Sequence, residues 1–133
     1  MKEFTVRSEQ RNQMIDITRE VQRVVEHEGV KDGMAVIYVP HTTAAVVINE
    51  GADPDVQRDI MATLQKLIPG QSDYRHLEGN SDAHIKSALI GCSQTLLVKE
   101  GRLLLGTWQH IFFFEGDGPR TRRVFVNVFG KSE

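Results

Sequence analysis

Three histidines lie where functional side chains are common, at the edges of predicted elements and in a loop. His41 directly follows Pro40 at a break between two predicted strands. His76 lies in the polar segment 70–80, and His84 falls in the first turn of a predicted helix. Neutral imidazoles from separate elements suit zinc or another divalent transition metal, and three protein ligands with one open position are typical of a catalytic site. The intervals from 41 to 76 and from 76 to 84 match no compact zinc motif, so three unrelated polar histidines are the alternative.

The other two histidines have simpler explanations. His27 ends a predicted amphipathic helix, where a cation interacts favourably with the helix dipole. His110 lies among aromatic residues in a predicted strand, where it can pack or form a pair. Neither is a primary candidate for the site.

The acidic segment 49–55 is a second candidate region, running from a predicted strand end into a helix start. Asp53 is a preferred N-cap residue, which explains it without any catalytic role. Glu50 has no such structural explanation, and a carboxylate beside buried strand residues is a candidate acid, base or metal partner. Both interpretations stay open for each residue.

Basic and hydroxyl side chains form a third candidate group. Arg120 and Arg122 are two residues apart and would face the same side of a strand, with Arg123 on the other side. Same-side arginines can bind phosphate or carboxylate groups, although a charged edge strand that resists aggregation would look the same. Thr42 and Thr43 would supply hydroxyl donors or cap a turn.

The elements that must position these residues are visible as hydrophobic periodicity. Strands are expected around Phe4–Val6 and over residues 34–39 and 44–49, and helices over residues 16–28, 53–67 and 81–90. In the C-terminal third, segments 96–98 and 103–105 predict one hairpin, and segments 108–115 and 122–129 predict a second around a Gly-containing turn. Small buried Cys92 would follow the third helix.

These elements predict one compact α+β domain over residues 1–133, a largely antiparallel sheet or sandwich with about three helices. Hydrophobic residues make up 40% of the chain and charged residues 26%, with a formal net charge of -2. A generic nucleic-acid binder would show a basic excess. No apolar run reaches bilayer-spanning length and no secretory signal is recognisable, so we expect a cytoplasmic protein that binds neither nucleic acid nor membrane.

Motifs over residues 38–126 together resemble the YjbQ-like family. They follow one another in the family's order: His41-Thr42-Thr43-Ala44-Ala45, Asn49-Glu50 with Asp53-Pro54 and Asp59, Tyr74-x-His76, Glu78-Gly79, His84-Ile85-Lys86-Ser87, Gly101-Arg102, Gly106-Thr107-Trp108-Gln109 and Arg122-Arg123. One residue departs from the pattern, since His110 stands where the family usually has glycine.

The resemblance implies a compact α+β homotrimer with a metal-binding pocket supplied with histidines. Carried onto this chain, the metal ligands would be His41, His76 and His84, and the acidic motif would give Glu50 and Asp53 catalytic roles. The expected contacts to substrate are Thr42, Thr43, Asn49, Gln109, Arg120 and Arg122.

Members of this family carry the description secondary thiamine-phosphate synthase, on the strength of a weak or auxiliary activity. The resemblance therefore implies a metal-dependent enzyme that joins a pyrimidine diphosphate to a thiazole phosphate, with zinc, another transition metal or, beside a diphosphate, Mg²⁺. The chain has no Asp-rich diphosphate motif and no (β/α)8 pattern. A metal-assisted hydrolase and a non-enzymatic metal- or metabolite-binding module are the alternatives.

Overall fold

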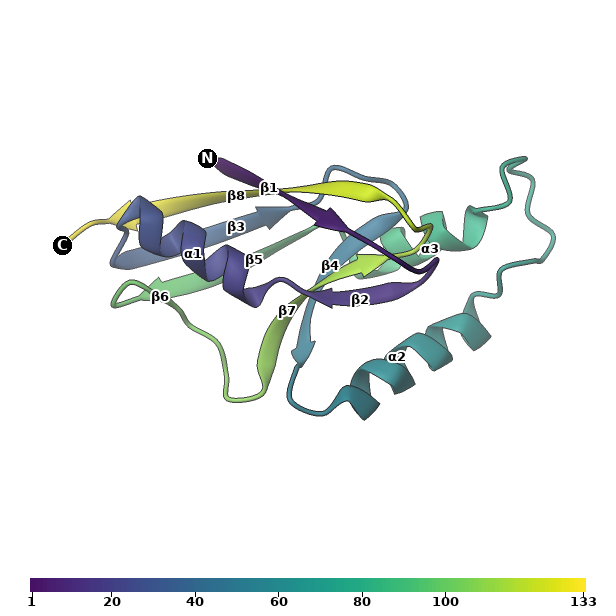
Figure 1. Cartoon of the computed structure of the whole chain (residues 1–133), viewed down its shortest axis with the longest axis horizontal. Helices are drawn as coiled ribbons and strands as arrows, with labels where there is room; N and C mark the ends of the chain where they lie inside the picture. Colours follow the sequence, from purple (N-terminus) through teal and green to yellow (C-terminus); the bar gives the residue numbers. More distant parts are fainter.

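Residues 1–133 form eight strands and three helices in the computed structural model (Figure 1). In chain order the elements are β1 (Lys2–Arg7), β2 (Gln13–Asp16), α1 (Thr18–Glu28), β3 (Asp32–Tyr38), β4 (Ala44–Glu50), α2 (Pro54–Leu67), α3 (Ser81–Ile90), β5 (Ser93–Lys99), β6 (Arg102–Leu103), β7 (Gln109–Glu115) and β8 (Thr121–Lys131). The predicted α+β class is confirmed.

The strands form two antiparallel sheets with one hydrophobic core. Sheet A has the order β1-β8-β3-β5-β6 and sheet B the order β2-β7-β4. Side chains alternate across each strand, so in β3 Ala35 and Ile37 are buried whereas Met34 and Tyr38 are exposed. Seventeen buried residues make up the core, most of them from the inner faces of both sheets and from α1. The opposite face of sheet A carries exposed apolar side chains, among them Leu97 and Phe129.

Helix α1 covers part of the inner face of sheet A. Val21 and Val25 are one turn apart and fully buried, which places the apolar stripe of the helix against the core. At its start, Asp16 accepts a hydrogen bond from the backbone N–H of Thr18 at 3.0 Å. At its end, Gly29 adopts the left-handed conformation with φ of 69°. The predicted helix is confirmed, two residues shorter because Asp16 ends β2.

The other two helices differ in how they are held. Helix α3 packs on the start of β4, where the Ser87 hydroxyl donates to the Ala44 carbonyl at 2.7 Å. Helix α2 begins as predicted, with Asp53 accepting from the Asp55 N–H at 2.9 Å. The apolar stripe of α2, which consists of Val56, Ile60, Leu64 and Leu67, is not part of the core, because no residue of the helix is buried and Leu67 is 72% exposed. Figure 1 shows α2 standing away from the sheets.

The second predicted hairpin is wrong. Strands β7 and β8 belong to different sheets, and residues 116–119 cross from sheet B to sheet A. The glycines here serve close packing instead of a tight turn, since a Cβ on Gly118 would lie 2.3 Å from the Gln10 carbonyl oxygen. The first hairpin is confirmed as β5 and β6, turning at Glu100 and Gly101, which both have positive φ.

Candidate functional site

His76 and His84 line one pocket. His76 lies in the loop between α2 and α3, His84 lies in the first turn of α3, and their ring centroids are 5.2 Å apart in an edge-to-face arrangement. The pocket has a volume of about 470 Å³ and is also lined by Asp73, Tyr74, Arg75, Ser81 and Ile85. The structure therefore brings together two of the three histidines that were expected to act together.

A buried charge network anchors the start of α3 and with it His84. Arg11 donates to both carboxylate oxygens of Asp82, each at 3.0 Å. Burial acts to raise the pKa of Asp82, but the Arg11 hydrogen bonds outweigh it and hold that pKa below its usual value. Lys86, 1% exposed, lies 3.6 Å from Asp82 and donates to Gln65 of α2 at 2.9 Å. Burial lowers the pKa of Lys86 despite its acidic neighbour.

The loop that carries His76 borders two hollows. Tyr74 closes the loop on itself by donating its hydroxyl to the Pro69 carbonyl at 2.5 Å. The second hollow is a cavity of about 470 Å³, and its lining includes Arg11, Tyr74, His76 and Gly79. His76 and Tyr74 thus border both spaces, and an arginine is present in each: Arg75 in the first, Arg11 in the second.

His41 does not join the other two histidines. Its Nε2 accepts a hydrogen bond from the backbone N–H of Arg123 at 2.9 Å, which requires an unprotonated nitrogen. Burial lowers the pKa of His41 below its usual value, and the positive charge of Arg122 lowers it further. No group of three His, Cys, Asp or Glu side chains lies close enough together to hold a metal ion. One chain therefore does not assemble the three-histidine centre.

Thr43 and Arg122 meet in a buried ion pair with Glu115. Arg122 donates to the Thr43 hydroxyl at 2.9 Å and to both carboxylate oxygens of Glu115. Arg120 precedes β8, is exposed and binds Asp117 at 2.9 Å, so the two arginines hold different carboxylates. Thr42 is exposed and makes no hydrogen bond through its side chain. These contacts give Thr43 and Arg122 a structural role.

The remaining candidates gather at the far end of β4. Glu50 pairs in register with Gln109 of β7. Glu50 accepts from the backbone N–H groups of Ala52 at 2.7 Å and Asp53 at 3.3 Å. Asn49 accepts from the N–H of Glu50 at 2.8 Å, and Gln109 accepts from a loop N–H at 2.8 Å. These side chains order the turn between β4 and α2 and the loop before β7.

The length of β4 separates this acidic end from the histidine pocket. Helix α3 packs at the first residue of β4, whereas Glu50 is its last. Seven residues of strand extend over on the order of 20 Å. Within one chain Glu50 and Asp53 therefore do not act on a group bound between His76 and His84.

Sequence reasoning missed Arg75 and Arg11 as pocket residues, and it placed Cys92 in the interior, whereas Cys92 is exposed. Cys92 follows the helix at Gly91, whose φ of 99° turns the chain outward into β5. The motif Tyr74-x-His76 was the available signal for the pocket. Arg11 carried no local signal, because its partner Asp82 is 71 residues away.

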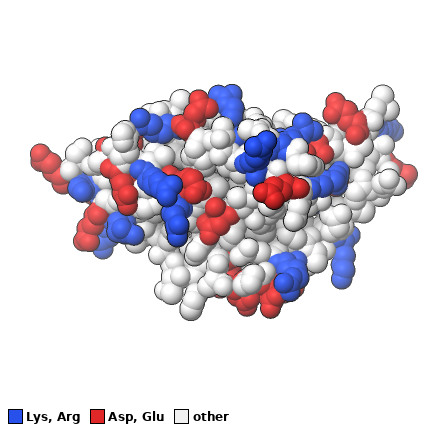
Figure 2. All heavy atoms as spheres, viewed as in Figure 1, with Lys and Arg blue, Asp and Glu red and all other residues white.

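Charges of both signs are interspersed on the face that α1 and β1 occupy (Figure 2). That face does not supply the continuous basic surface that nucleic-acid binding needs. None of the three helices combines the length and apolar composition of a membrane span.

Comparison with known proteins identifies the family. The family model described as UPF0047 protein YjbQ-like matches residues 2–131. The chain belongs to the YjbQ-like UPF0047 family. This YjbQ-like chain is 54% identical to a UPF0047 protein of Methanocaldococcus jannaschii over 96% of its own length and 92% of the relative's. It is 47% identical to the UPF0047 protein YugU of Bacillus subtilis, over 98% of this chain and 99% of YugU.

Solved structures of YjbQ-like proteins share the fold. A YjbQ/UPF0047 family protein of Clostridium acetobutylicum superimposes with a TM-score of 0.96 at 52% identity, covering 97% of this chain and 100% of that one. A protein of unknown function from Sulfolobus solfataricus gives a TM-score of 0.94 at 33% identity, covering 98% and 96%. The names of these relatives give a family and no reaction, so the thiamine-phosphate synthase activity stays a prediction.

Proposed function

We propose that this YjbQ-like protein is a small-molecule enzyme whose active site is the pocket of His76 and His84, and that its substrate is phosphorylated. The observation that carries the proposal is the pair of imidazoles 5.2 Å apart in a cavity of about 470 Å³. A pocket with convergent titratable groups is the usual place for acid–base chemistry. Arg75 in the same pocket supplies a cation for a phosphate group.

The reaction that we propose joins a pyrimidine diphosphate to a thiazole phosphate: the thiazole nitrogen forms a bond to the carbon that carries the diphosphate, the bond from that carbon to oxygen breaks, and pyrophosphate leaves. The two hollows of about 470 Å³ that the His76 loop borders offer room for two phosphorylated molecules. Arg75 and Arg11 would bind their phosphates, and the imidazoles would donate protons to the departing pyrophosphate. Arg11 keeps its ion pair with Asp82 in this role, because a guanidinium has five donors.

Metal dependence is a separate proposal, and the residues of a single chain do not fit it. Two imidazoles are fewer ligands than a catalytic metal site uses. Glu78 Oε2 lies 3.9 Å from His76 Nε2, yet no three His, Cys, Asp or Glu side chains form a group that could hold a metal ion. Zinc, another divalent transition metal or Mg²⁺ would therefore need ligands from the substrate or from another subunit. The proposed reaction has no step that depends on a metal ion.

We also propose a homotrimer, as the family resemblance implies, in the cytoplasm. Two apolar surfaces support association. One is the stripe on α2 described above, where Val56, Ile60 and Leu64 are only partly buried. The other is the outer face of sheet A, where Tyr38 and Leu97 are 46% and 60% exposed. Exposed apolar surface of this kind is typical of interfaces between proteins.

The test is formation of thiamine phosphate by the wild type and by His76→Ala, His84→Ala and His27→Ala, with elemental analysis of each. Loss of one acid–base group should lower turnover about 100-fold or more. His27→Ala is the matched control, because its ring lies at the end of α1. Full turnover in both pocket variants would exclude the proposed active site.

The same assay separates the alternatives. Pyrophosphate released without thiamine phosphate would indicate a hydrolase. Bound metal or substrate without any turnover would indicate a binding module. Metal content lost in His84→Ala but retained in His27→Ala would support metal binding at the pocket.

A further inference from the structure

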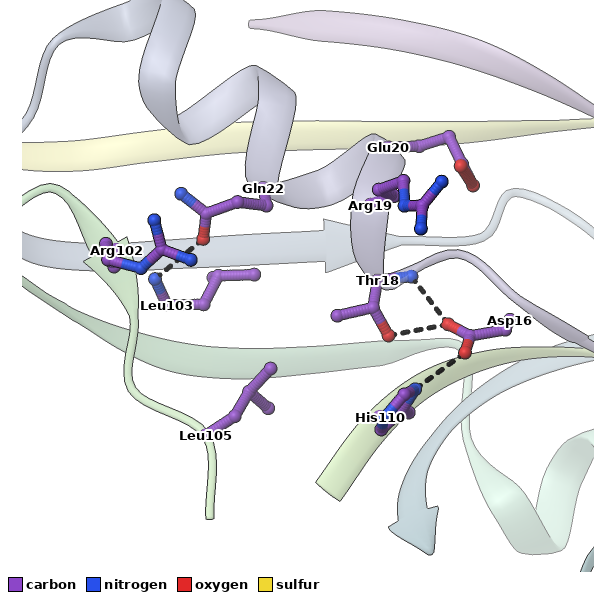
Figure 3. Close-up of a pocket in the computed structure, with 9 residues that line it drawn as sticks. All are labelled: Asp16, Thr18, Arg19, Glu20, Gln22, Arg102, Leu103, Leu105 and His110. Atoms are coloured by element: carbon purple, nitrogen blue, oxygen red, sulfur yellow. Dashed lines mark hydrogen bonds and ion pairs between the residues drawn. The ribbon is translucent and has the colours of Figure 1, made fainter. Parts of the chain in front are cut away.

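A second cavity lies away from the histidine pocket, between the start of α1, β6 and the beginning of β7. Its volume is about 610 Å³ and its polar lining includes Asp16, Arg19, Arg102 and His110. Figure 3 shows these side chains around a central space, with Arg102 on one side, Arg19 and Asp16 on the other, and His110 beside Asp16. None of these side chains takes part in the proposed function.

Asp16 and His110 form an oriented pair at this cavity. The His110 Nδ1 lies 2.6 Å from Asp16 Oδ2, and the other carboxylate oxygen accepts from the Thr18 hydroxyl at 2.6 Å. Burial acts to raise the pKa of Asp16, but the hydrogen bonds from Thr18 and His110 outweigh it and hold that pKa below its usual value. A charged carboxylate holds an imidazole proton on Nδ1, so in the neutral ring Nε2 is the hydrogen-bond acceptor.

The two arginines of the cavity are free to bind a ligand. Neither the Arg19 nor the Arg102 guanidinium has a hydrogen-bond or ion-pair partner within the chain, unlike Arg11 and Arg122. Glu20 also lines the cavity, but its carboxylate forms no ion pair with either arginine. Leu103 and Leu105 add an apolar wall. Unpaired guanidinium groups in a hollow are suited to carboxylate or phosphate.

We propose that this cavity is a second small-molecule site, for a small organic anion that carries a hydroxyl group. Arg19 and Arg102 bind the phosphate or carboxylate, and the free Nε2 of His110 accepts a hydrogen bond from the hydroxyl. Sugar phosphates and hydroxy acids share this chemistry. The site does not depend on the pocket of His76 and His84, so either proposal can fail alone.

The test is an NMR titration of the full-length protein with three probes: glycerol 3-phosphate, glycerate and inorganic phosphate. We expect the His110 ring and the Arg19 and Arg102 side-chain signals to shift with a hydroxylated anion. Whichever of glycerol 3-phosphate and glycerate binds with the higher affinity identifies the natural anionic group as phosphate or carboxylate. Inorganic phosphate, which lacks the carbon-bound hydroxyl, should bind more weakly than glycerol 3-phosphate.

Variants make the assignment specific. Arg19→Gln and Arg102→Gln should each weaken binding about tenfold or more, the effect of losing one charged hydrogen bond. His110→Gln should remove the preference for glycerol 3-phosphate over inorganic phosphate. Arg123→Gln is the matched control, because Arg123 pairs with Glu3 on sheet A and is absent from the cavity lining. No shift at these three residues with any probe, or equal binding by all folded variants, would overturn the proposal.

Discussion

Glu115 and Arg122 link the two sheets through a buried ion pair. Glu115 ends β7 in sheet B and is fully buried, and Arg122 lies in β8 of sheet A. The Ser8 hydroxyl donates to the same carboxylate at 2.7 Å. Burial acts to raise the pKa of Glu115, but the hydrogen bonds from Arg122 and Ser8 outweigh it, and the pKa lies below its usual value. The carboxylate therefore stays charged in the interior.

Replacing this carboxylate should destabilise the protein strongly. Glu115→Gln leaves the Arg122 guanidinium buried beside a neutral amide, and breaking a buried pair in this way costs about 3–5 kcal/mol. The free energy of unfolding from urea titration measures the loss. Glu3→Gln is the control, because Glu3 and Arg123 form an exposed pair that is worth about 1 kcal/mol or less. Equal losses in the two variants would contradict a stabilising role for the buried pair.

His41 should make stability depend on pH in mildly acidic solution. Burial and the charge of Arg122 hold its folded-state pKa below the usual value of 6.5, so the unfolded chain takes up a proton first as the pH falls. The contribution of the neutral ring is fully present above pH 6.5 and is lost as the pH falls below it. Unfolding measured at several pH values should show a smaller decline in His41→Gln than in the wild type. An unchanged decline would refute this.

At the scale of elements, the sequence predicted what local signals determine. Asp53 and Pro54 mark the start of α2, and alternating burial in β3 follows its apolar run. Strand pairing was harder, because Gly116 and Gly118 suggest a turn in either topology, while the partners of β7 lie far away in the chain. The four-residue β2 has no distinctive pattern, since it runs directly into α1.

The candidate site was predictable to the same extent. His76 and His84 are eight residues apart and flank one helix start, so sequence proximity brings them together. His41 was grouped with them by residue type, yet Arg123 occupies its Nε2. The pair of Asp16 and His110 joins residues 94 positions apart, and only the antiparallel pairing of β2 with β7 brings them into contact. Long-range pairs of this kind leave no spacing to detect.

At the scale of the whole molecule, two different apolar surfaces remain uncovered on one chain. The α2 stripe includes Ile60 and lines a hollow of about 400 Å³. The outer face of sheet A includes Tyr38, Phe125 and Phe129 and lines a groove of about 420 Å³. If α2 of one chain covers sheet A of the next, the contact is heterologous, and such contacts close into rings when the rotation permits. A three-membered ring is the state that we propose.

Two substitutions test this ring. Ile60→Lys on α2 and Leu97→Lys on sheet A each place a charge in an apolar contact, so we expect either variant to dissociate. Light scattering after size exclusion should give three times the 15.0 kDa chain mass for the wild type and the single-chain mass for both variants. Arg23→Glu is the control, because this exposed residue of α1 lies outside both surfaces and should leave the mass unchanged. A wild type of single-chain mass would refute the homotrimer. Trimeric variants would show that the ring uses other surfaces, because a lysine desolvated in an apolar contact costs several kcal/mol.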